Sequence, residues 1–143
     1  RPPRSTLFPY TTLFRSLNDG FLNALADEVI KRFPDKKIQI FSFQDSIDLD
    51  VCEKFARILA KKDRVKDVEV LSGLSVNDVF DKISELEYMI GMRFHANVAA
   101  IISGVKTLAI NYDIKVKKLA DEYDLPVIEL SQRDFTKEFD KLG

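Results

Sequence analysis

Residues 88–112 read YMIGMRFHANVAAIISGVKTLAINY, and this stretch decides the fold. A short apolar run at 88–92 is followed by an almost wholly apolar segment of helical length at 96–103, and a second apolar run occupies 107–112. Gly104 stands where the end of a helix often needs a left-handed residue. Two parallel strands need a long crossover between them, usually a helix. The stretch therefore predicts a strand–helix–strand unit of a parallel sheet.

The same alternation of helix and strand patterns continues on both sides of this unit. Before it, apolar periodicity predicts helices at 21–30, 52–60 and 76–83 and strands at 37–43 and 67–71. After it, the pattern predicts a helix at 116–123, a strand at 127–130 and a last helix that Ser131 would cap. Such alternation is typical of a parallel sheet with helices on both faces. We predict an α/β fold with a Rossmann-like parallel sheet of about five strands.

Composition excludes several classes of function. The chain has 143 residues, 45% of them hydrophobic, with 22 basic and 23 acidic side chains. This composition suits one globular domain, and the nearly balanced charge provides no positive electrostatic field for nucleic acid. No apolar run approaches the length of a membrane span. Cys52 and His95 are the only cysteine and histidine, so we expect no disulfide and no metal site. We expect a cytoplasmic protein, with peripheral association at the inner face of the membrane left open.

The first sixteen residues, RPPRSTLFPYTTLFRS, differ from the rest of the chain. They contain three arginines and no acidic residue, and they follow neither a helical nor a strand period. They resemble the in-frame translation of a common sequencing adapter at all sixteen codons; a targeting peptide is the alternative. We therefore expect residues 1–16 to be non-native and residues 17–143 to be genuine, with a net charge of −1 − 3 = −4. A strand expected before residue 17 would lie in the replaced part, so we expect a fragment.

Charged residues follow the strands predicted at 88–92 and 107–112. Ligands of open parallel sheets bind beyond the carboxyl ends of the strands, and there the sequence places Arg93, His95 and Lys115. A helix N-terminus favours an anion, arginine matches carboxylate or phosphate, and histidine carries a proton near neutral pH. These residues indicate a site for a small, multiply charged anion. A structural His95, a surface ion pair of Arg93 and a solvated Lys115 remain alternatives.

Two segments carry a resemblance to a known family. GMRFHA at 91–96, the apolar helix after it, and NYDIKV at 111–116 resemble the polysaccharide pyruvyl transferase family, whose pattern is roughly GMR-x-HA, an apolar helix, a GVP turn and S-Y-D-x-K. Phe43-Gln44 and Asp48-Leu49 are similar to a further stretch of the family, F-Q-x-x-x-D-L. The resemblance covers most of residues 17–130. Lys106 replaces the usual proline and Asn111 a frequent serine, which removes no charged site residue.

The resemblance implies an enzyme that transfers a pyruvyl group from phosphoenolpyruvate to a sugar of a cell-surface polysaccharide, forming a ketal. It implies His95 as the catalytic acid/base and Arg93 and Lys115 as cations that bind the donor substrate, without a further cofactor. It also implies a GT-B-like protein with two Rossmann-like domains. Residues 17–143 would be the C-terminal domain, and the missing N-terminal domain would hold part of the sugar acceptor.

Two other functions stay open on the residues alone. A nucleotide-sugar-binding domain of a GT-B-type glycosyltransferase or epimerase would need an acidic residue at a strand end, and no glutamate follows the apolar helix in that way. A non-catalytic, receiver-like α/β module would need an acidic cluster after the first strand, which Asp45 and Asp48 match poorly. The chain contains neither a G-x-G-x-x-G motif nor a P-loop, so a dinucleotide or nucleoside triphosphate site is unsupported.

Overall fold

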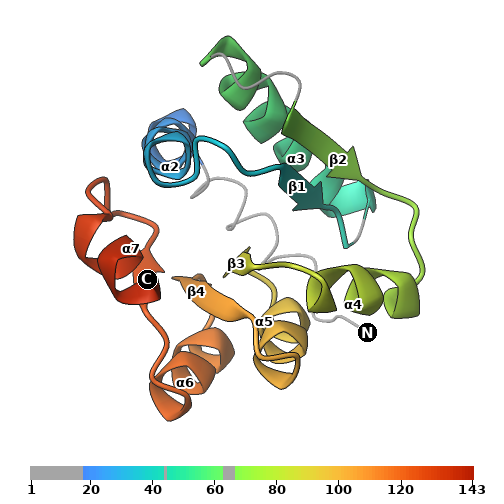
Figure 1. The fold of residues 1–143 in the computed structure, drawn as a ribbon, viewed down its shortest axis with the longest axis vertical. Helices are drawn as coiled ribbons and strands as arrows, with labels where there is room; N and C mark the ends of the chain where they lie inside the picture. Colours follow the sequence, from blue (N-terminus) through green and yellow to red (C-terminus); the bar gives the residue numbers. More distant parts are fainter. Residues whose placement is uncertain (1–17, 44, 63–66) are drawn as a thin grey trace. The chain divides into compact units, whose positions relative to one another are not determined.

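The computed structural model describes residues 18–43, 45–62 and 67–143. The stretch interpreted as adapter-derived and the strand expected before residue 17 lie outside these residues. Six helices and five strands alternate along the described part of the chain (Figure 1). All strand pairs are parallel, which confirms the predicted α/β, Rossmann-like class. The chain divides into two compact units, residues 1–74 and residues 75–143.

The described part of the first unit is a two-stranded sheet with two helices. Its elements are α2 (Asp19–Arg32), β1 (Ile38–Phe41), α3 (Asp45–Lys61) and β2 (Val68–Leu71). β1 pairs with β2 in parallel, and α3 connects them and packs on both. α2 buries one apolar face, including Phe21 and Leu25, and packs along α3. Cys52 is buried on α3, which confirms that it fills space in the core.

Local chemistry explains where several helices begin and end. Asn18 caps α2 by accepting a hydrogen bond from the Phe21 N–H at 2.9 Å, and the helix ends at Arg32, with Phe33 as its C-cap directly before Pro34. Ser75 accepts a hydrogen bond from the Asp78 N–H at 3.1 Å, so the predicted start of the next helix is also confirmed.

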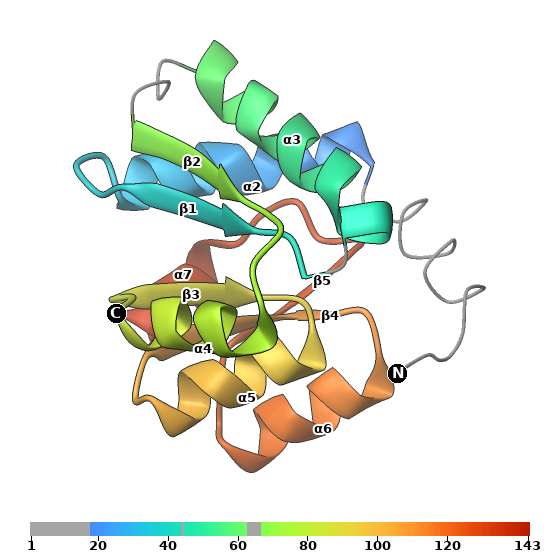
Figure 2. The same cartoon turned by 90° about the vertical axis from the view of Figure 1, so that its right-hand side faces the viewer.

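The second unit is a three-stranded parallel sheet with four helices. Its strand order is β3–β4–β5, and each strand is followed by a helix. Connections between parallel strands are almost always right-handed, so two successive connections in one direction put their helices on the same face. α5 and α6 accordingly lie side by side along one face (Figure 2). The bounds are α4 (Val76–Ser84), β3 (Tyr88–Gly91), α5 (Phe94–Ile102), β4 (Lys106–Asn111), α6 (Ile114–Glu122), β5 (Val127–Glu129) and α7 (Thr136–Leu142).

The central strand β4 forms the core of this unit. Four consecutive residues, 107–110, are buried, as the continuous apolar pattern predicts for a strand covered on both faces. Ala109 of β4 packs with Val116 and Ala120 of α6, all three fully buried. Gly104 has a φ of +73°, which confirms its place after the end of α5. Helix α6 therefore packs on the buried central strand through Val116 and Ala120.

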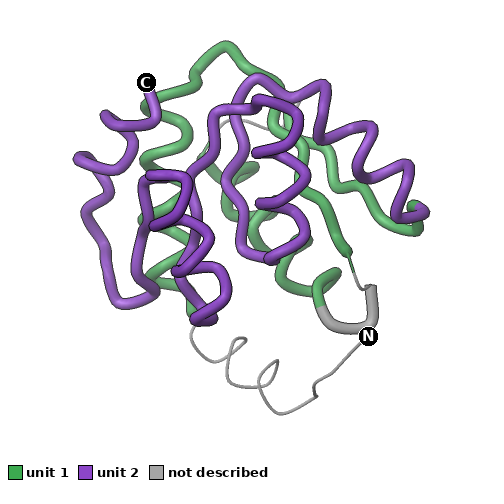
Figure 3. Tube along the Cα trace, turned by 90° about the horizontal axis from the view of Figure 1, so that it is seen from below, with its two compact units in different colours: residues 1–74 green, residues 75–143 purple. Residues whose placement is uncertain are grey.

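Three expectations differ from the structure. One sheet of about five strands was predicted, whereas the strand pairs give a two-stranded sheet in the first unit and a three-stranded sheet in the second; Figure 3 colours the two units separately. Ser131 does not cap the last helix; the Asp134 carboxylate accepts the Thr136 N–H at 3.0 Å instead. Val76, expected on the apolar face of its helix, is 70% exposed because it opens the first turn.

Candidate anion-binding site

Two neighbouring strand ends bring the three predicted site residues to one edge of one sheet. β3 and β4 are parallel, with Gly91 opposite Ala109, so the connections to α5 and α6 leave from the same edge (Figure 2). Arg93 is the N-cap of α5, and His95 is the second residue of that helix. Lys115 is the second residue of α6. The expected juxtaposition of their backbone positions is therefore present in the fold.

The side chains at this edge differ in exposure. His95 and Lys115 are exposed, whereas Arg93 is half-buried. The His95 ring stands edge-on to Phe94, with ring centroids 5.5 Å apart and an interplanar angle of 88°. An aromatic neighbour restricts the imidazole on one side and leaves the rest of the ring facing solvent. The exposed side chains of His95 and Lys115 are accessible to a ligand from solution.

The two helix N-termini differ in their capping. The Arg93 side chain makes no capping hydrogen bond to α5, and the first turn of α5 contains no acidic residue. At α6, the Asp113 carboxylate accepts the Lys115 N–H at 3.0 Å. Because helix N-termini carry partial positive charge, the start of α6 already holds an anionic group of the chain itself. The start of α5 is the more favourable place for an anion from outside.

Packing inside the protein requires a residue without a side chain at position 91. Asn97, one turn into α5, donates from Nδ2 to the carbonyl oxygens of Gly91 and Arg93, each at 3.1 Å. A Cβ atom on Gly91 would lie 2.3 Å from Asn97 Oδ1, which is closer than real atoms approach. The close approach at Gly91 is made by the side chain of Asn97 on the packed helix α5. The sequence signal for Asn97 was a polar residue inside an apolar helix.

A carboxylate at the same edge was not foreseen. Asn111, the last residue of β4, lies opposite Glu129, the last residue of β5. Its Nδ2 donates to both Glu129 carboxylate oxygens, at 2.9 and 3.2 Å. Glu129 is separated from the apolar helix by a further strand and helix, so only the strand register reveals it. The edge thus carries an acidic group beside its cations, held by an amide.

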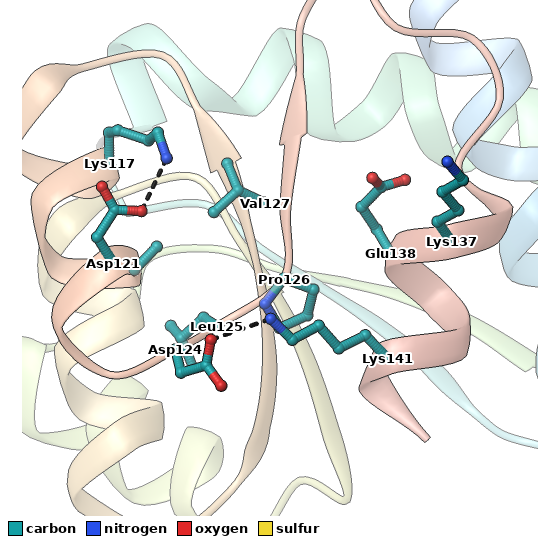
Figure 4. A pocket seen from close by; sticks show the side chains of 10 residues that line it. Lys117, Asp121, Asp124, Leu125, Pro126, Val127, Lys137, Glu138 and Lys141 are labelled. Atoms are coloured by element: carbon teal, nitrogen blue, oxygen red, sulfur yellow. Dashed lines mark hydrogen bonds and ion pairs between the residues drawn. The ribbon is translucent and has the colours of Figure 1, made fainter.

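A cavity elsewhere in the second unit contains none of the predicted site residues. It measures about 340 Å³ and lies between α6, α7 and the start of β5 (Figure 4). Lys117 pairs with Asp121 at 2.7 Å, and Lys141 pairs with Asp124 at 3.1 Å. The hydrogen bond to Asp121 raises the pKa of Lys117; desolvation opposes this effect, and the charges of Asp121 and Glu129 add to it. These paired charges give the cavity no excess of positive charge for an anion.

Two further classes of feature can be described briefly. Among residues 18–43, 45–62 and 67–143, no group of three or more histidine, cysteine or acidic side chains is arranged to hold a metal ion. No helix in the described ranges is both long and apolar enough to cross a membrane.

A family comparison decides the assignment. The model of the polysaccharide pyruvyl transferase family matches residues 8–114. The chain belongs to the polysaccharide pyruvyl transferase family. The matched stretch contains Arg93 and His95 and ends one residue before Lys115; it begins within the stretch interpreted as adapter-derived. A comparison with curated proteins and another with solved structures found no match. The family is one of transferases named for the pyruvylation of polysaccharides.

Proposed function

We propose that this chain supplies the donor-binding half of a site that transfers a pyruvyl group from phosphoenolpyruvate to a sugar. The observation that carries the proposal is the start of α5, where a family-matched segment combines an arginine N-cap, an exposed histidine and no acidic residue. Lys115, the second residue of the neighbouring helix α6, lies at the same sheet edge. Arginine, lysine and a helix N-terminus are the groups that bind phosphate and carboxylate.

The donor has the charge pattern that this edge suits. Phosphoenolpyruvate carries a phosphate and a carboxylate on adjacent positions of a three-carbon skeleton. Arg93 offers a planar fork that can bond two oxygens at once, and Lys115 offers a point charge. One cation would hold the carboxylate and the other the phosphate, and the N–H groups of the first α5 turn would add hydrogen bonds to either group.

The reaction requires a proton donor as well as cations. Protonation of the donor's methylene carbon gives a methyl group and an oxocarbenium-like C2. One sugar hydroxyl attacks C2, a second attacks as the C2–O bond to phosphate breaks, and the ketal and inorganic phosphate result. One hydroxyl proton balances the new methyl hydrogen and the other leaves with phosphate. His95 acts as the acid/base because imidazole exchanges protons near neutral pH, and Arg93 and Lys115 stabilise the departing phosphate.

The complete reaction needs more than this chain in our proposal. Residues 17–143 form the C-terminal Rossmann-like domain of a GT-B-like enzyme whose N-terminal domain binds part of the acceptor. The enzyme acts in the cytoplasm, at or near the inner face of the membrane, on a sugar of a cell-surface polysaccharide. We expect the chain alone to bind phosphoenolpyruvate and to transfer little or no pyruvate.

Binding of the donor can be tested on the chain itself. His95 is the only histidine, so the ring proton signals of histidine in an NMR spectrum belong to it without further assignment. We expect phosphoenolpyruvate to shift these signals saturably. Arg93→Gln should weaken the affinity by about 10- to 100-fold, because a hydrogen bond to a charged group contributes about 1.5–3 kcal/mol. Lys118→Gln, an exposed substitution on α6, is the matched control and should leave the affinity unchanged.

Two results would contradict the proposal. The first is a chain whose His95 signals do not respond to millimolar phosphoenolpyruvate. The second is displacement of phosphoenolpyruvate by a lower concentration of UDP-glucose, which would favour a nucleotide-sugar site instead. Pyruvyl transfer by the isolated chain would contradict only the need for an N-terminal domain.

A further inference from the structure

Asn97 is a buried polar residue in the body of α5. Its side chain is fully buried, and Ala96, Ala99 and Ala100 around it in the helix are buried as well. Burying an amide costs free energy unless its donors and acceptor are hydrogen-bonded. An apolar residue would satisfy the pattern of this helix at lower cost. The presence of asparagine therefore calls for a specific role.

The amide nitrogen of Asn97 ties the end of β3 to the start of α5. Nδ2 donates to the carbonyl oxygen of Gly91, the last residue of the strand, and to that of Arg93, the N-cap. The backbone N–H of Asn97 also donates to the Arg93 carbonyl, at 3.1 Å. Arg93 is thus held through two hydrogen bonds from a single residue. These bonds fix the peptide plane from which the Arg93 side chain and the following turn depart.

Gly91 leaves the space that the Asn97 side chain occupies. The amide fills the space that a side chain at residue 91 would occupy, since an added Cβ would lie 2.3 Å from Oδ1 and 2.8 Å from Cγ. Oδ1 has no hydrogen-bond partner among the described residues. The structure therefore leaves one buried acceptor unsatisfied and has no space for a side chain at residue 91. Both N–H donors of the Asn97 amide form hydrogen bonds to the strand–helix connection.

We propose that Asn97 is a positioning residue, which holds Arg93 and His95 in the geometry that receives the phosphoenolpyruvate anion. The inference rests on the proposed function. Asn97 itself is buried and does not contact the ligand; it acts through the backbone of Arg93. Misplacement of a binding group by about 1 Å can cost up to about 100-fold in rate. A less firmly held connection between β3 and α5 should therefore impair the site.

The test separates positioning from general stability. Asn97→Leu keeps a side chain of similar size and removes both donors, and Asn97→Ala provides a smaller alternative. Ala100→Gly is the control, because it lies one turn further along the same buried helix and lowers helix stability without touching the connection. For each chain we would measure thermal unfolding, the affinity for phosphoenolpyruvate, and the NMR signals of the His95 ring and the Arg93 Nε–H without ligand.

We expect Asn97→Leu to weaken phosphoenolpyruvate binding by about tenfold or more and to move the His95 and Arg93 signals. Ala100→Gly should keep the affinity within about twofold of the parent chain, even if its melting temperature falls as much as that of Asn97→Leu. The proposal is overturned if a folded Asn97→Leu chain binds like the parent chain, or if the control loses as much affinity. It is also overturned if both Asn97 variants fail to fold under conditions where Ala100→Gly folds, since Asn97 would then serve folding.

Failure of the proposed function gives a different pattern. In that case the parent chain itself does not bind phosphoenolpyruvate, and the ligand-free signals decide on Asn97. Movement of the His95 ring and Arg93 Nε–H signals in Asn97→Leu but not in Ala100→Gly supports the positioning role. Unchanged signals in both variants reject it.

Discussion

The helices α5 and α6 begin at neighbouring strand ends of one sheet, and their first residues correspond position by position. Each has a basic or titratable side chain at its second residue, His95 in α5 and Lys115 in α6. Their N-caps are opposite in charge, because α5 has Arg93 where α6 has Asp113. The same local fold thus supports two different electrostatic environments at one edge.

The difference separates stability from binding. Aspartate is among the best N-cap residues, and replacing such a cap by alanine costs about 1 kcal/mol. α6 keeps that contribution, with Asp113 bonded to its first turn. α5 gives it up, since its arginine makes no capping hydrogen bond. A helix whose first turn contains no acidic residue keeps its favourable interaction with an external anion, so α5 is the helix that we expect to receive the ligand.

The largest expected difference between the two helices concerns turnover. In an enzyme assembled from this chain and the proposed N-terminal domain, His95→Ala should lower phosphate release from phosphoenolpyruvate by about 10²- to 10⁴-fold, the usual contribution of an acid/base group. Lys115→Ala should lower it less and leave the shape of the pH–rate profile unchanged. Phosphate release with acceptor sugar present is the measurement. Unchanged turnover of His95→Ala would reject the assigned role.

The next effect concerns the arginine N-cap. Arg93→Asn should weaken phosphoenolpyruvate binding by about 10- to 100-fold, because it removes the charged fork. The same substitution introduces a preferred N-cap, which by itself contributes about 0.5–1 kcal/mol to the free energy of unfolding. Titration followed by NMR and denaturant unfolding give the two quantities. A variant that loses both affinity and stability would show that Arg93 serves the fold, contrary to the comparison.

A smaller effect is expected when α6 is made more like α5. Asp113→Asn keeps a side-chain oxygen that can cap Lys115 N–H, so stability should change by less than about 0.5 kcal/mol. Loss of the negative charge should strengthen phosphoenolpyruvate binding by roughly two- to fivefold at low salt, and less at high salt because exposed charges are screened. Affinity measured at two salt concentrations tests both statements. Weaker binding would indicate that Asp113 orients Lys115 toward the ligand.

The sequence predicted the strand–helix–strand unit well because its signal is local. Continuous apolar residues at 107–110 indicate a strand buried on both faces, and the structure buries all four. The edge at which Arg93 and Lys115 meet followed from the rule that parallel strands end on the same side. Their roles toward a ligand stay predictions.

Capping and side-chain contacts were harder to predict because a shift of one or two residues in a helix start or in the strand register changes which residues meet. Ser131 has the residue type of a cap, but the chain makes a turn after it and Asp134 takes the role. Glu129 and Asn111 come together only through the register of β4 and β5. Asn97 was visible as a polar residue in an apolar helix, yet its two carbonyl partners depend on how α5 leaves the strand.

The smallest effect is expected at Lys117, two residues beyond Lys115 on the same helix. Lys117 pairs with Asp121 beside the cavity of α6 and α7, so Lys117→Met should leave the affinity for phosphoenolpyruvate unchanged. Because the Asp121 hydrogen bond raises the pKa of Lys117 above the ordinary lysine value of 10.5, the pair stabilises the fold below that pH and loses its contribution as the pH rises through the raised pKa. The melting temperatures of parent and variant should therefore differ slightly at neutral pH and converge in strongly alkaline solution. A variant that binds phosphoenolpyruvate more weakly would extend the anion site along α6 and remove the contrast between its two lysines.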